Sequence, residues 1–270
     1  MRLVGISVLV LVISGLGAPT IAQTEQLVGC DLDALSVLLL SASSTLQDIK
    51  DEEAVVLLSD LGATIETAKL SCSLKTIDYS AIPQSRTVDG GFVLGDPDAP
   101  LTIVEFSDFL CGHCQQYEAV VSQFIEEFVV TGEAKFEYRM FPVIDPEASP
   151  FVAQLAECAD TLRPGSFWEA HDVLFALIID QGLTQSSVDM YVDRMELNLD
   201  DLVACFEGAN QIAVDSEFGS DLGVTGTPAV MVRYGDGEPE WIVVDDQTFD
   251  RGGVDFEILA AVVENASKSE

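Results

Sequence analysis

The stretch VEFSDFLCGHC, residues 104–114, decides how the rest of the chain is interpreted. Residues 101–106 (LTIVEF), which lead into it, form a mostly apolar run typical of a buried strand, and helical periodicity follows over residues 115–130. Cys111 and Cys114 therefore stand where a strand ends and a helix begins. A thiol at a helix N-terminus lies next to unpaired backbone N–H groups and the positive end of the helix dipole, so its thiolate form is favoured.

This placement predicts a redox-active cysteine pair. We expect Cys111 to be exposed and nucleophilic, with His113 as a positive or hydrogen-bonding neighbour. Cys114, one turn further along, is expected to be buried and to act as the resolving thiol. The alternatives are a zinc half-site and a structural disulfide. Zinc needs four ligands, usually from a second cysteine pair that this sequence lacks, and the two-residue spacing is tight for a structural disulfide. We therefore expect redox chemistry with no metal and no bound cofactor.

The composition excludes several classes of partner. The chain of 270 residues has 46 Asp and Glu against 12 Lys and Arg, a formal net charge of −34. Apolar residues make up 48%, enough for a core, so the acidity does not indicate a disordered chain. Binding to nucleic acid or to an anionic membrane surface requires a positive surface, which this charge argues against.

Residues 1–22 have the pattern of an export signal. Arg2 precedes an apolar run, and small residues up to Ala22 suit cleavage there. An uncleaved N-terminal membrane tether is the alternative. Residues 27–30 also match a lipoprotein processing site, but the polar residues 23–26 separate it from the apolar run. All six cysteines lie beyond the signal, and an even number suggests pairing in an oxidising compartment. We expect an extracytoplasmic protein: periplasmic, in the cell envelope, or secreted.

The remaining chain divides into segments that differ in their predicted secondary structure. Two amphipathic helices are expected in residues 23–75, and their antiparallel packing would join Cys30 to Cys72. Residues 76–91 are interpreted as a linker. An α/β domain over residues 92–145 and 223–266 is interrupted by a helical insertion over 146–222. Within the α/β domain we expect a buried strand at 101–106, a half-exposed strand at 135–141, a hairpin of strands 229–234 and 240–244, and a last helix at 254–263.

An aromatic stripe at helical spacing occurs within the insertion. Its residues are interpreted as core packing and not as a ligand site: Phe167, Trp168, His171, Leu174 and Phe175.

Two motifs carry a resemblance to a known family. Residues 104–114 resemble the active-site segment of the DsbA-like branch of the thioredoxin superfamily, and GVTGTP at 223–228 resembles the cis-proline loop of that superfamily. The helical insertion also lies where this branch has one. The resemblance covers about residues 88–265. It implies an α/β thioredoxin fold with an inserted helical cap, preceded here by the N-terminal helical hairpin.

The resemblance also implies roles for individual residues. Pro228 would be cis and would place the backbone of Thr227 beside the Cys111 sulfur, where it pairs with an extended substrate; otherwise Pro228 would be a strand-entry proline. Glu105 matches the buried acid that exchanges a proton with Cys114, and the alternative is a solvent-facing strand residue. A structural Cys158–Cys205 disulfide is expected in the insertion, in preference to a second redox pair.

The family resemblance implies a thiol oxidase that forms disulfides in exported proteins and is reoxidised by a membrane quinone-linked partner. Two departures leave the direction open. Gly112 and His113 separate the cysteines as in eukaryotic protein disulfide isomerases, whereas oxidases of this branch carry Pro-His, and Thr227 resembles the bacterial isomerases. An isomerase or reductase with the same dithiol is therefore the alternative. A non-catalytic folding-assist or interaction module is the alternative of another class.

Overall fold

The computed structural model describes residues 77–267. The chain divides into two compact units, residues 1–62 and 63–270, and the described part belongs to the second. The expected signal segment (1–22) and helical hairpin (23–75), with its Cys30–Cys72 disulfide, lie outside the described residues. Within residues 77–267, none of the helices has the length and apolar character needed to cross a bilayer.

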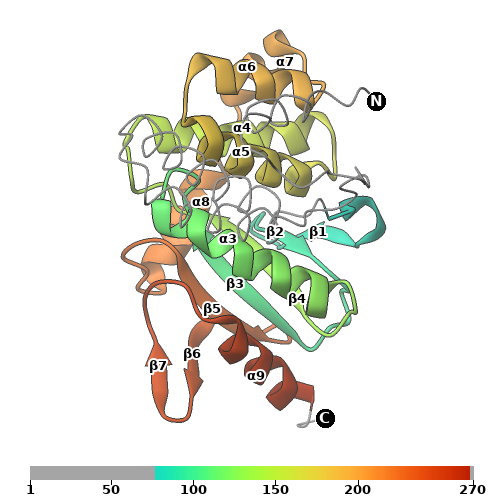
Figure 1. Ribbon diagram of the computed structural model, residues 1–270, viewed down its shortest axis with the longest axis vertical. Coiled ribbons are helices and arrows are strands. Elements are labelled where there is room, and N and C mark those ends of the chain that lie inside the picture. Colours follow the sequence, from blue (N-terminus) through green and yellow to red (C-terminus); the bar gives the residue numbers. More distant parts are fainter. Residues whose placement is uncertain (1–76, 268–270) are drawn as a thin grey trace, which may run out of the picture. The chain divides into compact units, whose positions relative to one another are not determined.

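A seven-stranded mixed sheet forms the centre of the fold (Figure 1). Its strand order is β1-β2-β4-β3-β5-β6-β7. Only β3 and β4 pair in parallel, and every other neighbouring pair is antiparallel. The strands are β1 (Gln84–Arg86), β2 (Phe92–Leu94), β3 (Leu101–Ser107), β4 (Lys135–Met140), β5 (Ala229–Tyr234), β6 (Glu240–Val244) and β7 (Gln247–Phe249).

Helices cover the sheet and form a separate layer at one end of it. α3 (Gly112–Phe124) continues into one π-helical turn (Ile125–Val129). It contacts α9 (Phe256–Ser267), and the two helices lie in front of the sheet in Figure 1. The insertion between β4 and β5 is wholly helical, and a short 3₁₀ turn, Tyr79–Ala81, precedes β1. The helices of the insertion are α4 (Ala148–Leu162), α5 (Phe167–Gln181), α6 (Gln185–Arg194), α7 (Leu199–Phe206) and α8 (Gln211–Asp221).

Strand register gives the sheet two different faces, because successive side chains of a strand point to opposite sides. We call the face beneath α3 the dithiol face; it carries Ile103, Glu105, Ser107, Phe136, Tyr138 and Met140. We call the opposite face the arginine face; it carries Val104, Phe106, Glu137, Arg139, Met231 and Arg233. α8 packs against β4 on this second side, where its Phe218 contacts both Phe106 and Arg139.

Buried charges on the arginine face are all paired. Arg139 of β4, 1% exposed, donates to Glu137 at 2.6 Å, to Asp215 of α8 at 2.9 Å and to Asp89 at 2.8 Å. Glu137 also receives hydrogen bonds from Arg233. Although burial favours its neutral form, hydrogen bonds from Arg139 hold the pKa of Asp89 at about 2. These ion pairs hold together the loop between β1 and β2, the sheet and α8.

Two expectations about the strands were wrong. The strand at 135–141 is buried on both faces instead of half-exposed, because β4 lies between β2 and β3 and its charges are paired within the protein. The linker interpretation of residues 76–91 also failed, since residues 84–86 form the edge strand β1. Arg86 of this strand stacks on Phe92 at 3.9 Å and pairs with Asp160. A short polar edge strand leaves no hydrophobic alternation to detect.

The helical insertion has the predicted disulfide. Cys158 of α4 and Cys205 of α7 are joined across a sequence separation of 47 residues. The aromatic stripe of α5 is buried as expected, since each of its five residues is at most 3% exposed. One member of the stripe, His171, nevertheless has polar partners that a packing interpretation did not anticipate.

Candidate active site

Cys111 occupies the N-cap of α3, directly after the loop that leaves β3. Its backbone is extended (φ −75°, ψ 115°), and α3 begins at Gly112. Asp108, 2% exposed, fixes this loop, because one carboxylate oxygen accepts the Leu110 N–H at 2.9 Å and the other accepts two N–H groups of residues 143 and 144 at 2.9 Å. Asp108 therefore ties the loop before Cys111 to the segment that enters the insertion. It stands within the quoted stretch, but sequence reasoning gave it no role.

The cis-proline loop lies against the first thiol. The Thr227–Pro228 peptide bond is cis, and the Cys111 thiol donates to the Thr227 carbonyl at 3.3 Å. The expectation that Cys111 is exposed was wrong: the residue is 3% exposed, because the loop packs over its sulfur. His113 and Gly112 are exposed at the start of α3, and no atom of residues 77–267 outside its chain neighbours lies within 4 Å of a Cβ placed on Gly112. The open side of the dithiol is thus the Gly-His turn.

Cys114 and Glu105 form the buried half of the dithiol. Both are completely buried, Cys114 in the first turn of α3 and Glu105 on the dithiol face of β3. Among residues 77–267, neither carboxylate oxygen of Glu105 has a hydrogen-bond partner. Burial raises the pKa of Glu105 to about 7, and burial together with the negative charge of Glu105 raises the pKa of Cys114. An acid with this pKa can take up or release a proton near neutrality, which fits exchange with the Cys114 thiol.

A further buried acid lies beside the dithiol that sequence reasoning missed. Glu118 of α3, 1% exposed, is four residues after Cys114 and therefore on the same helix face. Burial, followed by the negative charge of Glu105, raises its pKa well above the usual range. The signal that could have revealed it is this spacing, since a glutamate one turn after a buried cysteine points into the same core.

His171 of α5 links Glu118 to the surface. Its Nε2 lies 3.8 Å from a Glu118 carboxylate oxygen, and its Nδ1 lies 3.0 Å from Asp172. One ligand-type atom from each of these three residues lies within 4.8 Å of the others, as a metal site would require. However, the closest carboxylate contacts are to opposite nitrogens of the imidazole, and a single ion binds only one ring nitrogen. The arrangement therefore fits a chain of proton donors and acceptors better than a ligand set.

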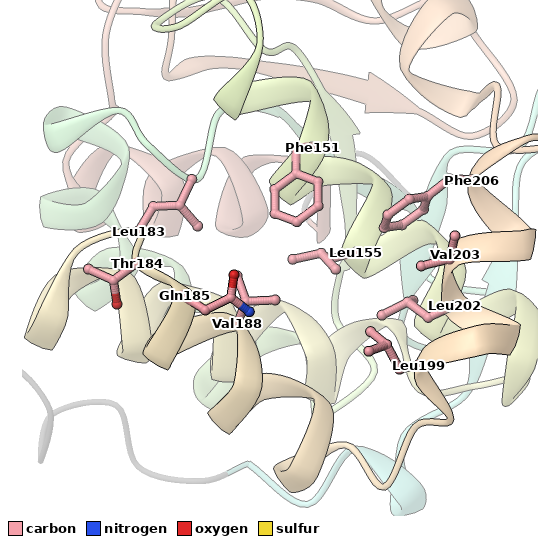
Figure 2. Close-up of a pocket in the computed structure, with 10 residues that line it drawn as sticks. All are labelled: Phe151, Leu155, Leu183, Thr184, Gln185, Val188, Leu199, Leu202, Val203 and Phe206. Carbon is pink, nitrogen blue, oxygen red and sulfur yellow. The ribbon is translucent and has the colours of Figure 1, made fainter.

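An apolar pocket of about 410 Å³ lies elsewhere in the helical insertion (Figure 2). No residue of the dithiol loop or the cis-proline loop lines it. In Figure 2 the side chains of α4 and α7 extend into the space beside α6. They come from Phe151, Leu155, Leu183, Thr184, Gln185, Val188, Leu199, Leu202, Val203 and Phe206. The pocket is therefore separate from the thiol chemistry.

Comparisons with known proteins agree with this geometry. A family model described as thioredoxin matches residues 87–235, more than half of the chain. The Na(+)/H(+) antiporter NhaA 1 of Salinispora arenicola is 35% identical over 151 residues, which are 54% of this chain and 22% of that protein. Disulfide bond formation protein D of Bacillus subtilis is 26% identical over 165 residues, 57% of this chain and 72% of that protein. The chain thus spans about a fifth of the length of the antiporter relatives that it matches.

Solved structures support the same conclusion for the fold. The α-DsbA1 protein of Wolbachia pipientis has a TM-score of 0.56 and 19% identity, with 68% of this chain and 94% of that chain covered. The matched family model spans the dithiol loop, the insertion and the cis-proline loop together. The helical insertion between β4 and β5 is also where the DsbA-like resemblance places it. The chain therefore belongs to the thioredoxin family, in the DsbA-like form of its fold.

Proposed function

We propose that this protein is a thiol–disulfide oxidoreductase that acts on the cysteines of other proteins, chiefly as an oxidase. One observation carries the proposal: the Cys111 sulfur lies at the N-terminus of α3, 3.3 Å from the Thr227 carbonyl, with Cys114 and Glu105 buried beneath it. A thiol at a helix N-terminus, a backbone edge for substrate and an internal proton acceptor are what thiol–disulfide exchange requires.

The oxidising reaction begins with Cys111 and Cys114 joined. A substrate thiolate attacks the Cys111 sulfur, the Cys111–Cys114 bond breaks, and its electron pair passes to Cys114, which takes a proton from protonated Glu105. A second substrate thiolate then attacks the substrate sulfur held on Cys111. The substrate disulfide forms, and Cys111 leaves as a thiolate at the positive end of α3. Two electrons have moved from the substrate to the enzyme, which is left as the free dithiol that the structure contains.

Substrate orientation follows from the cis-proline loop. Thr227 presents its carbonyl toward Cys111, so an extended substrate segment can pair with this backbone while its cysteine meets the Cys111 sulfur. His113, exposed beside Cys111, is placed to favour the thiolate by a charge or a hydrogen bond. The redox-active group is the cysteine pair itself. Clients would be unfolded or folding exported proteins that carry thiols.

Cellular context is part of the proposal. The signal-like residues 1–22, the paired cysteines and the similarity to disulfide bond formation protein D support a place outside the cytoplasm. There a membrane quinone-linked partner would reoxidise the dithiol. Gly112 and Thr227 favour a second candidate, an isomerase or reductase, in which Cys111 attacks a client disulfide instead.

The proposal is tested by two activity assays and by a measurement of the reduction potential. The native protein is expected to reoxidise reduced ribonuclease in the presence of a small-molecule oxidant, and Cys111→Ser is expected to abolish this activity. The matched control replaces both Cys158 and Cys205 by Ser, which removes a disulfide of the insertion but leaves the dithiol. Ribonuclease reoxidation that is equal in the native protein and Cys111→Ser, and no faster than with the oxidant alone, would favour the non-catalytic module. A reduction potential as low as that of thioredoxin, with insulin reduction and no ribonuclease oxidation, would favour the reductase.

A further inference from the structure

We propose that Glu118 and His171 form a proton path that connects Glu105 and Cys114 with solvent at Asp172. The inference rests on the proposed exchange at Cys111 and Cys114, and it assigns a function to two residues that act through Glu105 and not on the sulfur itself. The path runs from β3 through α3 to α5, so the helical insertion contributes directly to the chemistry of the dithiol.

The chemistry requires such a path in both directions. When the enzyme oxidises a substrate, Cys114 receives an electron pair and one proton, which Glu105 supplies and must then regain. When the enzyme is reoxidised, the Cys114 thiol gives one proton to Glu105, its sulfur forms the new bond to Cys111, and that proton must leave. Cys114 and Glu105 are both completely buried. Direct exchange of this proton with bulk water is therefore blocked while the fold stays closed.

The inner half of the path consists of groups in one buried region. Cys114 and Glu118 lie one turn apart on the buried face of α3, and Glu105 faces them from β3. Glu105 interacts electrostatically with both Cys114 and Glu118. In the described part of the chain, Glu105 has no hydrogen-bond partner at either carboxylate oxygen, and Glu118 has none at Oε1. These oxygens are free to accept and release a proton.

The outer half leads from Glu118 to the surface. The 3.8 Å between Glu118 and His171 Nε2 exceeds a hydrogen bond, and a shift of less than about 1 Å brings the pair within bonding range. On its other side His171 contacts Asp172 at 3.0 Å, and Asp172 also accepts a hydrogen bond from the Tyr79 hydroxyl at 2.8 Å. The Asp172 side chain is 25% exposed, so a proton that reaches it can enter water. An imidazole with a carboxylate at each nitrogen can take a proton on one side and release one on the other.

Among the described residues, the two buried acids of the path are not neutralised by a lysine or arginine. The other titratable groups that face it are the phenols of Tyr79, Tyr117 and Tyr138, whose pKa values burial raises, so they stay neutral. Within residues 77–267, no lysine or arginine forms an ion pair with Glu105 or Glu118. Aromatic rings from Phe109, Phe167, Trp168 and Phe175 pack around His171. An apolar side chain in place of His171 would meet this packing need without burying an imidazole.

The test separates the two thiols kinetically. Reduced protein is mixed with an aromatic disulfide, 5,5′-dithiobis(2-nitrobenzoate), in a stopped-flow instrument. Attack by Cys111 releases the first thionitrobenzoate, and attack by Cys114 on the resulting mixed disulfide releases the second. The second phase therefore reports loss of the Cys114 proton. It is measured from pH 5 to pH 8, in H₂O and in D₂O, for the native protein, Glu118→Gln and His171→Phe.

We expect both variants to keep the first phase and to slow the second about ten-fold, below the roughly 10²–10⁴-fold effect of a proton-transfer group that touches the reacting atom. The solvent isotope effect of the second phase is expected to increase, because proton removal becomes rate-limiting. The matched control is Glu157→Gln, which changes another buried glutamate, one that accepts the backbone N–H groups of Asn210 and Gln211 in the insertion. It is expected to leave both phases unchanged.

Three results would overturn the inference. They are a second phase within two-fold of native in both variants, an unchanged isotope effect, or equal slowing of both phases with a lowered melting temperature, which would indicate a structural role. The assay uses no protein client. It therefore stays informative even if ribonuclease oxidation fails, and failure of the proton path leaves the proposed oxidase function standing.

Discussion

Glu105 and Glu137 lie on neighbouring strands of one sheet, both completely buried, yet their surroundings are opposite. On the dithiol face, Glu105 has no hydrogen-bond partner among the residues that the structure describes, and burial raises its pKa to about 7. On the arginine face, Glu137 is held by Arg139 and Arg233. The strand register places the two glutamates on opposite faces of the sheet, because Val104 pairs with Glu137 and Glu105 pairs with Tyr138.

The comparison shows two ways to keep a carboxylate inside a protein. A buried charge that is fully paired stabilises one arrangement of the elements around it, and removing its partner is costly. A buried carboxyl without partners exists near neutral pH in both protonation states and can move protons. We infer that the arginine face holds the fold together and that the dithiol face performs the chemistry.

The largest expected effect comes from removing the cation at the arginine face. Arg139→Leu leaves Glu137 and Asp215 without their main partner, and we expect a loss of about 3–5 kcal/mol in the free energy of unfolding by urea denaturation. The control is Arg163→Ala, whose partner Glu169 is 52% exposed, with an expected loss of at most about 1 kcal/mol. Equal losses in the two variants would contradict the assigned role of this face.

The pH dependence of stability tests the other face. Folding raises the Glu105 pKa from 4.5 to about 7, so its contribution is fully present below about pH 4.5 and is lost as the pH rises to about 7, by at most about 3 kcal/mol. Glu105→Gln removes this loss. Asp215, whose pKa burial raises to about 6, contributes in both proteins, so the difference between their curves reports Glu105 together with its effect on Glu118. Parallel curves over pH 4–8 would mean that Glu105 does not titrate in this range.

A steric change tests how closely α8 covers the arginine face. A Cβ on Gly219 would lie 2.9 Å from the rings of Phe106 and Phe141, so Gly219→Ala is expected to cost about 1–3 kcal/mol in the free energy of unfolding. At the start of α3, a Cβ on Gly112 meets no atom of the described residues within 4 Å. Gly112→Ala is therefore expected to change stability by less than about 1 kcal/mol. A thermal melt of both variants decides whether the contrast holds.

The smallest expected effect concerns a hydroxyl. The Tyr138 hydroxyl on the dithiol face is buried with no hydrogen-bond partner from residues 77–267, so Tyr138→Phe is expected to change the free energy of unfolding by less than about 0.5 kcal/mol. Tyr191 in the insertion donates to the Leu155 carbonyl at 2.9 Å, so Tyr191→Phe is expected to lose about 1 kcal/mol. If Tyr138→Phe is the more damaging change, the dithiol face has hydrogen bonding that its geometry does not reveal.

The central part of the fold could be predicted from the sequence because its signals are local. β3 is a short, mostly apolar run, and the dithiol follows it after a short loop. A Gly-Asp-Gly turn joins β5 and β6 in a hairpin. The strand β1 and the burial of β4 could not be predicted, since both depend on which strands lie next to them. Polar residues such as Glu137 and Arg139 look exposed in sequence until the partner on α8 is known.

The candidate site divides in the same way. Cys111, Cys114, Glu105 and the Thr227–Pro228 pair lie in two motifs whose resemblance to a family brings them together. The exposure of Cys111 was predicted wrongly, because it depends on how closely a loop more than a hundred residues away packs on its sulfur. The contact between Glu118 and His171 was not predictable either, because it depends on the rotation of α5 about its axis relative to α3.

The position of α5 has a consequence for how this protein can diversify. A helical insertion that only covered a catalytic domain could be exchanged between relatives to change client preference, with the chemistry untouched. Here α5 also supplies the imidazole beside Glu118. Selection for new clients is then constrained by the need to keep this helix in register with the dithiol. Variation in the insertion is accordingly expected to accumulate in α6 and α7, around the apolar pocket, while α5 changes slowly.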